Sequence, residues 1–215
     1  MVTRVVAGPL EANSYILRGD GGCVVVDPGG CDVARVLEAC DRASILITHG
    51  HFDHVAGLKC VLESINVEEV VAHRLVAEVY RESLRLASMW GLDVEEASLS
   101  VTRALEGDED LSLYGFKVKA LYTPGHSPDH TVYYIPSLSI LFSGDLLFKG
   151  SIGRWDLPGG DASLLEESLK RVSRLPGDTR VLPGHGDDTV LGVEMRVNPL
   201  LQLALKGMLE HYSTF

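Results

Sequence analysis

The alternation of hydrophobic and polar positions predicts short strands in the first fifty residues. β-Branched and apolar residues gather in brief runs separated by glycine and proline. The runs are 2–7, 14–18, 22–27 and 44–48. The last of them is continuously apolar, which is typical of a strand buried on both faces. Helical periodicity predicts helices over 32–40, 55–64 and 75–89, and Gly91 ends the last one.

The second half of the chain repeats this arrangement of strands followed by helices. Its predicted strands are 101–105, 111–114, 116–122, 131–135, 138–143 and 180–182. Helices are expected at 161–174 and over 193–211, with a break at Pro199. Two strand-rich halves, each closed by helices, favour an α/β protein with an αββα sandwich. No linker-like stretch divides the halves, so a single domain over 1–215 is expected.

The composition narrows the classes of function. The chain has 46% hydrophobic and 23% charged residues, the ordinary balance of a soluble globular protein. Its net charge of −11 argues against a nucleic-acid partner, because phosphates are held mainly by Lys and Arg. No apolar run approaches the roughly 20 residues of a membrane span. The first residues lack the basic and apolar stretches of a signal peptide, so the cytoplasm is the expected location.

Four cysteines contain no C-x-x-C pair, so zinc-finger and thioredoxin-type interpretations are weak. They are Cys23, Cys31, Cys40 and Cys60. Free cysteine behaves as a small hydrophobic residue. We therefore expect reduced and mostly buried thiols.

The candidate chemistry lies in histidine-containing segments that each follow a predicted strand. The segments are T-H-G-H-F-D-H with His49, His51, Asp53 and His54, T-P-G-H with His126, F-S-G-D with Asp145, and P-G-H-G with His185. Loops beyond strand ends are where a rigid sheet presents functional groups. On an extended loop, alternate histidines project to one side and can reach one ion. The spacing therefore predicts a metal centre. His130 is expected to support that centre rather than to ligate.

This ordered set of motifs resembles the metallo-β-lactamase superfamily over essentially the whole chain. The resemblance implies the αββα sandwich and two divalent ions. One ion would bind His49, His51 and His126; the other would bind Asp53, His54 and His185; Asp145 and a hydroxide would bridge the two. Zinc is the expected metal, and the imidazole and carboxylate ligands also suit iron and manganese. Asp53 and Asp145 are the candidate catalytic carboxylates.

The segment 144–161, G-D-L-L-F-K-G-S-I-G-R-W-D-L-P-G-G-D, is similar to that of small glyoxalase II-like hydrolases, the hydroxyacylglutathione hydrolase family. The resemblance implies hydrolysis of a small hydroxyacyl thioester such as S-lactoylglutathione by metal-bound hydroxide. Lys149 and Arg154 are candidate substrate contacts. For Lys149 the alternative is a solvated charge, and for Arg154 it is a buried ion pair with Asp156 or Asp161.

Three other activities are open at this point. Persulfide dioxygenases share most of these motifs but use one iron and typically end in P-A-H-D instead of P-G-H-G. A β-lactamase usually has Cys near the position of Asp145. A non-catalytic metal-binding scaffold is a further alternative, which the complete ligand set disfavours.

Full-length glyoxalase II enzymes hold glutathione with a basic C-terminal domain. After His185 this chain has only Arg196 and Lys206, so weak affinity for glutathione is expected. The oligomeric state is left open.

Overall fold

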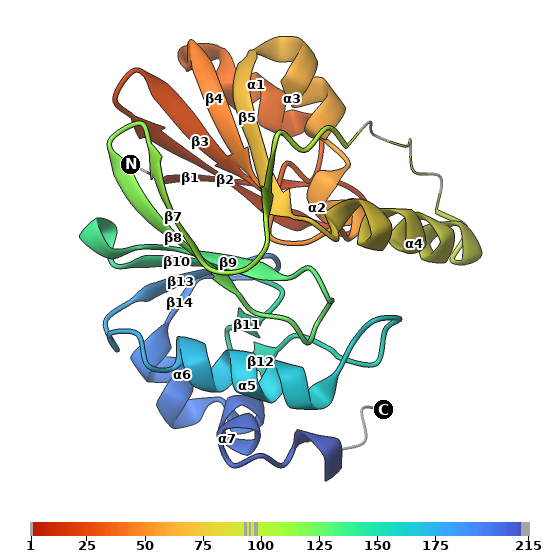
Figure 1. The fold of residues 1–215 in the computed structure, drawn as a ribbon, viewed down its shortest axis with the longest axis vertical. Helices are drawn as coiled ribbons and strands as arrows, with labels where there is room; N and C mark the ends of the chain where they lie inside the picture. The colour runs from red at the N-terminus through yellow and green to blue at the C-terminus, as the bar shows by residue number, and fades with distance from the viewer. Residues whose placement is uncertain (1, 93, 95, 97–98, 212–215) are drawn as a thin grey trace.

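The computed structural model describes residues 2–92, 94, 96 and 99–211 and contains two six-stranded sheets stacked face to face (Figure 1). The first sheet has the order β1 (Val2–Ala7), β2 (Ala12–Gly19), β3 (Gly22–Val26), β4 (Arg42–Leu46), β5 (Asn66–His73) and β6 (Arg103–Leu105). Strands β1 to β3 are antiparallel, and β3 to β6 are parallel. The parallel strands therefore end at one edge of the sheet.

The second sheet is antiparallel except for one central pair. Its order is β14 (Thr189–Val190), β13 (Arg180–Pro183), β10 (Ile140–Gly144), β9 (Thr131–Ile135), β8 (Phe116–Tyr122) and β7 (Glu109–Leu113). The parallel pair is β10 with β13. A small hairpin, β11 (Leu147–Phe148) and β12 (Ser151–Ile152), follows β10.

Helices cover the outer face of each sheet. Over the first sheet lie α1 (Asp32–Val36), α2 (Phe52–Val55), α3 (Leu58–Ser64) and α4 (Val76–Met89). Over the second lie α5 (Ala162–Val172), α6 (Leu191–Val197) and α7 (Pro199–Leu205). Three short 3₁₀ turns complete the described chain: Leu37–Ala39, Pro136–Leu138 and Leu209–His211. None of the helices in the described part of the chain is long and apolar enough to cross a membrane.

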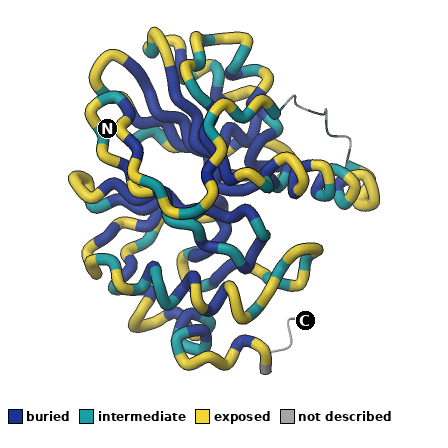
Figure 2. The backbone as a smooth tube through the Cα atoms, viewed as in Figure 1, coloured by how far each residue is buried: buried dark blue, intermediate teal, exposed yellow. Residues whose placement is uncertain are grey.

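Strand β3 shows how the sequence produces these layers. Cys23 and Val25 pack into the cluster beneath the helices of the first sheet. Val24 and Val26 point the opposite way, into the cluster between the two sheets. A strand with two buried faces needs apolar residues at every position, which explains the continuous G-C-V-V-V run. The buried band runs through both sheets in Figure 2.

Most predicted elements are present, and β8 and β9 have the predicted bounds. The predicted helix 55–64 is instead divided into α2 and α3, which are separated at Gly57. A Cβ atom at Gly57 would lie 2.2 Å from the Gly30 carbonyl oxygen, and its N–H donates to the Pro28 carbonyl at 2.7 Å. The chain therefore breaks here to press against the 28–30 loop. The predicted helix 32–40 ends early, since residues 37–39 form a 3₁₀ turn.

The expectation of reduced thiols was wrong. Cys23 pairs with Cys40, and Cys31 pairs with Cys60, with Cα–Cα distances of 6.0 and 5.3 Å. The partners are 17 and 29 residues apart in sequence, and only the packing of α1 and α3 on the first sheet brings them together. Motif spacing therefore gave no signal for the pairing. The two bonds link the ends of the segment 31–40 to strand β3 and to helix α3.

Reduction of these disulfides is expected to destabilise the protein without changing its fold. Closing loops of this length stabilises by about 3 kcal/mol per bond, because it restricts the unfolded chain. Urea unfolding with and without a phosphine reductant measures the effect. A variant with all four cysteines replaced by alanine is the control and should not respond to the reductant. Equal midpoints for the parental protein, together with four reactive thiols in its folded state, would show that the bonds do not form.

Candidate metal centre

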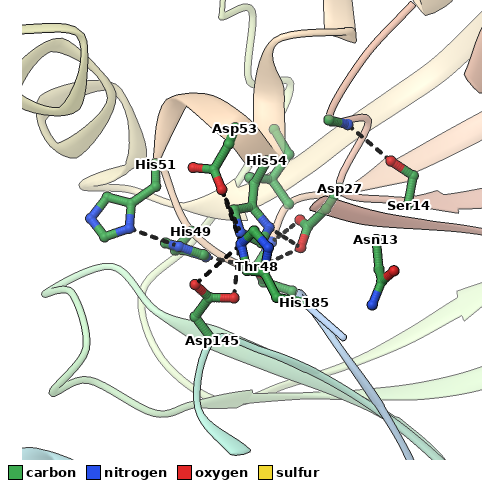
Figure 3. A network of polar contacts seen from close by, with 12 residues as sticks. Asn13, Ser14, Asp27, Thr48, His49, His51, Asp53, His54, Asp145 and His185 are labelled. Carbon is green, nitrogen blue, oxygen red and sulfur yellow. Dashed lines mark hydrogen bonds and ion pairs between the residues drawn. The ribbon is translucent and has the colours of Figure 1, made fainter. Parts of the chain in front are cut away.

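The candidate site lies where strand ends of the two sheets face one another. His49 and His51 follow β4 of the first sheet, and His51 is the residue immediately before α2. Asp145 directly follows β10 of the second sheet, and His185 lies just beyond β13. His126 comes from the loop that joins β8 to β9. Distant parts of the sequence therefore converge on one place, as Figure 3 shows for the first four of these residues.

Three imidazoles form the first group of candidate ligands. Nδ1 of His51 lies 3.0 Å from Nε2 of His49 and 3.0 Å from Nε2 of His126. His126 donates its Nδ1–H to the backbone carbonyl of Arg154 at 2.8 Å. A carbonyl can only accept, so Nε2 of His126 presents a lone pair to the centre of the group. Such an outer hydrogen bond is how metal-binding histidines are commonly oriented.

Asp53, His54 and His185 form the second group. Both Asp53 and His54 lie on α2, and His185 approaches from the second sheet. Nε2 of His185 lies 3.0 Å from Oδ2 of Asp53, and Nε2 of His54 lies 3.6 Å from the same oxygen. His54 is fully buried, whereas the side chain of His185 is 31% exposed. This group therefore forms the more accessible part of the site.

The Asp145 carboxylate lies between the two groups (Figure 3). Its Oδ2 is 3.6 Å from Nε2 of His126 and 3.7 Å from Nε2 of His185, and its Oδ1 is 3.4 Å from Nε2 of His54. Burial opposes ionisation of Asp145, but His54, His126 and His185 lower its pKa below the usual value. An ionised carboxylate here can reach an ion in either group.

Two buried polar atoms indicate that the site is built around cations. His54 Nε2 and Asp145 Oδ1 are buried and have no hydrogen-bond partner. Nδ1 of His54 lies 3.0 Å from the Asp27 carboxylate, to which it donates, so the Nε2 of the neutral ring has its lone pair directed at the Asp145 oxygen. Two electron-pair donors that face each other in a buried site are satisfied by a metal ion placed between them. The residues here therefore fit a bound divalent ion.

The protonation states also suit metal binding. Burial lowers the pKa of His49 well below its usual value, and His54 lowers it further. Burial and then His126 lower the pKa of His51 to about 3. Both rings are therefore neutral at physiological pH and can offer lone pairs. His54 differs: burial alone would lower its pKa, but nearby carboxylates, Asp145 foremost, raise it well above the usual value. Without a metal its ring therefore holds a proton, which a metal ion binding at Nε2 would displace.

Asp27 is a residue of the site that the sequence motifs did not reveal. Its carboxylate accepts hydrogen bonds from the backbone N–H of Thr48 at 2.7 Å and from the Thr48 hydroxyl at 2.6 Å. The same carboxylate orients His54. Asp27 has a left-handed backbone with φ of 50°, a costly conformation for a residue other than glycine. In the sequence, Asp27 could have been recognised as a candidate site residue because it directly follows strand β3, which pairs with β4.

Asn13 and Tyr15 hold the loop that carries His185. The Asn13 side chain donates to the carbonyls of Pro183 and Gly186 at 2.9 and 2.8 Å. The Tyr15 hydroxyl donates to the Pro183 carbonyl at 2.7 Å. Strand β2 therefore sets the position of a ligand that lies 170 residues away in the sequence. The sequence placed Tyr15 on a strand and gave no signal for Asn13.

His130 belongs to neither group of candidate ligands. Its Nε2 accepts a hydrogen bond from the backbone N–H of Asp145 at 3.1 Å, and its Nδ1 contacts the Thr123 hydroxyl at 2.9 Å. The neighbouring Asp129 accepts from the Gly50 N–H, between His49 and His51, at 2.7 Å. The 127–130 segment thus supports ligands from both sheets.

The structure places the two candidate substrate contacts on the exposed surface. Lys149 lies 3.1 Å from Asp187, and both side chains are mostly exposed. Arg154 forms two hydrogen bonds with Asp156, at 2.7 and 2.8 Å, and this pair is also exposed. The alternative expected for Arg154, a buried ion pair, was therefore wrong about burial, whereas Asp156 is one of the two partners expected. The contribution of Arg154 to the centre comes from its backbone carbonyl.

Comparison with known proteins assigns the family. A model of the metallo-β-lactamase superfamily matches residues 7–185. The chain belongs to the metallo-β-lactamase superfamily. The superfamily is one of metallo-hydrolases, and the predicted αββα fold class is confirmed.

Individual members of the superfamily are similar along nearly their whole length. The probable metallo-hydrolase YqgX of Bacillus subtilis is 34% identical, over 92% of this chain and 96% of that protein. The hydroxyacylglutathione hydrolase GloC of Haemophilus influenzae is 31% identical, over 87% and 91%. Among solved structures, TTHA1623 in a di-iron-bound form is 41% identical with a TM-score of 0.82, over 92% and 99%. The BLEG-1 B3 metallo-β-lactamase is 33% identical with a TM-score of 0.82, over 94% and 99%.

Proposed function

We propose that this protein is a dinuclear metal-dependent hydrolase that cleaves a small hydroxyacyl thioester of the S-lactoylglutathione type. The observation that carries the proposal is the Asp145 carboxylate, which lies between two complete sets of candidate ligands. In the proposed assignment, one ion binds His49, His51 and His126, and the other binds Asp53, His54 and His185. The similarity to GloC supports the choice of thioester.

The bound ions would supply a hydroxide nucleophile near neutral pH and polarise the thioester carbonyl. The residues of the chain hold and orient the reactants. Asp53, whose pKa is lowered by His54 and His185 in spite of its burial, stays ionised and can accept a hydrogen bond from the attacking water. The thiolate leaves without a strong acid, since a thiol has a pKa of about 8.5. Asp145 keeps the two ligand groups at a fixed separation.

The geometry around Gly184 supports the hydrolase over the persulfide dioxygenase. A Cβ atom at Gly184 would lie 2.2 Å from Oδ1 of Asp145 and 2.6 Å from Cε1 of His54. Alanine, as in the P-A-H-D ending of the dioxygenases, therefore requires the Asp145 carboxylate and the His54 ring to shift from these positions. The P-G-H-G ending of this chain leaves room for both side chains, which supports the proposed bridging role of Asp145.

The metal and the cellular location are part of the proposal. Zinc is the proposed metal, although TTHA1623 binds two irons, and the ligand set suits either.

The proposed location is the cytoplasm. Disulfides are rare in most cytosolic proteins but frequent in those of hyperthermophiles. The chain has only three asparagines and one glutamine, a composition that is also typical of thermophiles.

A parallel assay tests the proposal. The protein, loaded separately with zinc, iron and manganese, is given S-D-lactoylglutathione, glutathione persulfide, a phosphodiester and a cephalosporin. We expect thiol release from the thioester with no oxygen uptake, and faster turnover of the thioester than of the other three substrates. Oxygen uptake with the persulfide and no thioester cleavage under any metal would replace the hydrolase with the dioxygenase. Preferred cleavage of the cephalosporin would instead make the protein a β-lactamase.

A further inference from the structure

A groove begins at His51 and runs along helix α4. Its volume is about 660 Å³, and its walls come from α4 and from the loops around Pro128 and Pro158 (Figure 1 shows these loops below α4). This volume lies in the range of small-molecule sites and exceeds what a small acyl group needs. His51 is the only candidate metal ligand in the groove wall among the described residues. The groove therefore leads from the first ligand group to the part of the substrate that does not react.

The charges in the groove wall come from α4, and two of them have no ion-pair partner among the described residues. Arg85 pairs with Glu82 at 2.9 Å, so these two neutralise each other. Arg81 uses its Nε to contact the Ala77 carbonyl at 3.1 Å, and its guanidinium forms no ion pair with any described residue. Glu78 likewise has no ion pair among the described residues. One cation and one anion therefore remain to interact with a ligand.

The spacing of Glu78 and Arg81 defines which ligand they suit. Residues three apart lie one helical turn from each other, with Cβ atoms about 5–6 Å apart. A group that carries an ammonium and a carboxylate on one carbon can place each charge against its opposite here. The remaining wall includes Leu75, Val79 and Leu86, which can cover the apolar part of such a ligand.

We propose that Glu78 and Arg81 bind the α-amino-acid zwitterion of a peptidic thiol carrier, with Arg81 on its carboxylate and Glu78 on its ammonium group. This inference deepens the proposed function and rests on it for the identity of the reacting thioester. These two side chains would bind the thiol carrier without the basic C-terminal domain of full-length glyoxalase II enzymes. Arg196 lies on α6 and Lys206 directly follows α7, both in the helical layer over the second sheet. Neither residue lines the groove.

Substitutions Arg81→Gln and Glu78→Gln test the proposal with two matched thioesters. One is S-D-lactoylglutathione, and the other carries the same acyl group on uncharged N-acetylcysteamine. We expect each variant to raise KM for the glutathione thioester about tenfold, as loss of a charge-assisted hydrogen bond does, with kcat unchanged. KM for the N-acetylcysteamine thioester should not change. The control is Arg35→Gln, which removes an exposed arginine of α1 outside the groove and should behave as the parental protein.

Binding of a ligand that cannot be hydrolysed separates this proposal from the proposed reaction. Calorimetry with S-methylglutathione should show about tenfold weaker binding for each variant. N-acetylation of the ligand removes its ammonium group, so Glu78→Gln should then have no further effect, as a double-mutant cycle requires. Unchanged binding in both variants, or an equal KM increase for the charged and uncharged thioesters, overturns the assignment of Glu78 and Arg81. Normal binding without hydrolysis of any thioester overturns the proposed function alone.

Discussion

Replacement of Asp145 by alanine is expected to lower both the metal content and the turnover of the protein. The carboxylate lies within 3.7 Å of a nitrogen from each ligand group, so its loss removes a side chain that reaches both. His54 Nε2 would then face an empty space in a buried site. We expect fewer than two ions per chain and a kcat/KM lower by a factor of about 100 or more, the scale of losing one electrostatic stabiliser in a closed site.

Metal analysis and thioester kinetics on the purified variant measure this effect. Asp187→Ala is a matched control, because Asp187 is an exposed aspartate on the loop that follows His185, and Lys149 is its one ion-pair partner among the described residues. It should keep full metal content. An Asp145→Ala protein with two ions per chain and near-parental turnover would show that this carboxylate does not bridge.

Replacement of His126 and of His185 is expected to empty different metal positions. His126 approaches His49 and His51, whereas His185 approaches Asp53, and no ligand group contains both. Loss of an outer hydrogen-bond partner lowers metal affinity by roughly 10- to 100-fold. Loss of a side chain that binds the ion directly should lower the affinity for that ion by more. Each variant should also lose most of its turnover, because the proposed reaction uses both ions.

Anomalous scattering from crystals of the two variants measures occupancy at each position. His73→Ala is a suitable control, since His73 stacks on Tyr122 with ring centroids 4.6 Å apart and belongs to no ligand group. If His126→Ala and His185→Ala empty the same position, the division of the ligands into two sets is wrong.

The sequence predicted the candidate ligands because they occupy short motifs directly after strands. Strand ends can be located from local hydrophobic runs such as 22–26, and backbone geometry then places the following residues at the sheet edge. The assignment of these residues as metal ligands stays a prediction. Their convergence, with Asp145 between His54 and His126, is what the structure adds.

Other features depend on contacts between distant segments and had no local signal. The local pattern does not predict strand β5, because the adjacent acidic residues Glu68 and Glu69 interrupt its apolar run, and its parallel pairing with β4 decides its conformation. The hydrogen bonds of Asn13 to Pro183 and Gly186 cross 170 residues or more. The disulfides likewise depend on how α1 and α3 pack. Each of these features follows from tertiary packing, which a single sequence does not display.

The source of the oxygen atom in the product tests the central claim most directly. Zinc-loaded protein is given S-D-lactoylglutathione in ¹⁸O-labelled water without dioxygen, and the product acid is examined by mass spectrometry. Hydrolysis at a two-metal centre predicts lactate with one ¹⁸O atom, formed in step with free thiol, and at least about 100-fold slower product formation by the Asp145→Ala variant. Failure to form lactate in the absence of dioxygen, with product that carries label only when ¹⁸O₂ is supplied, would contradict the account.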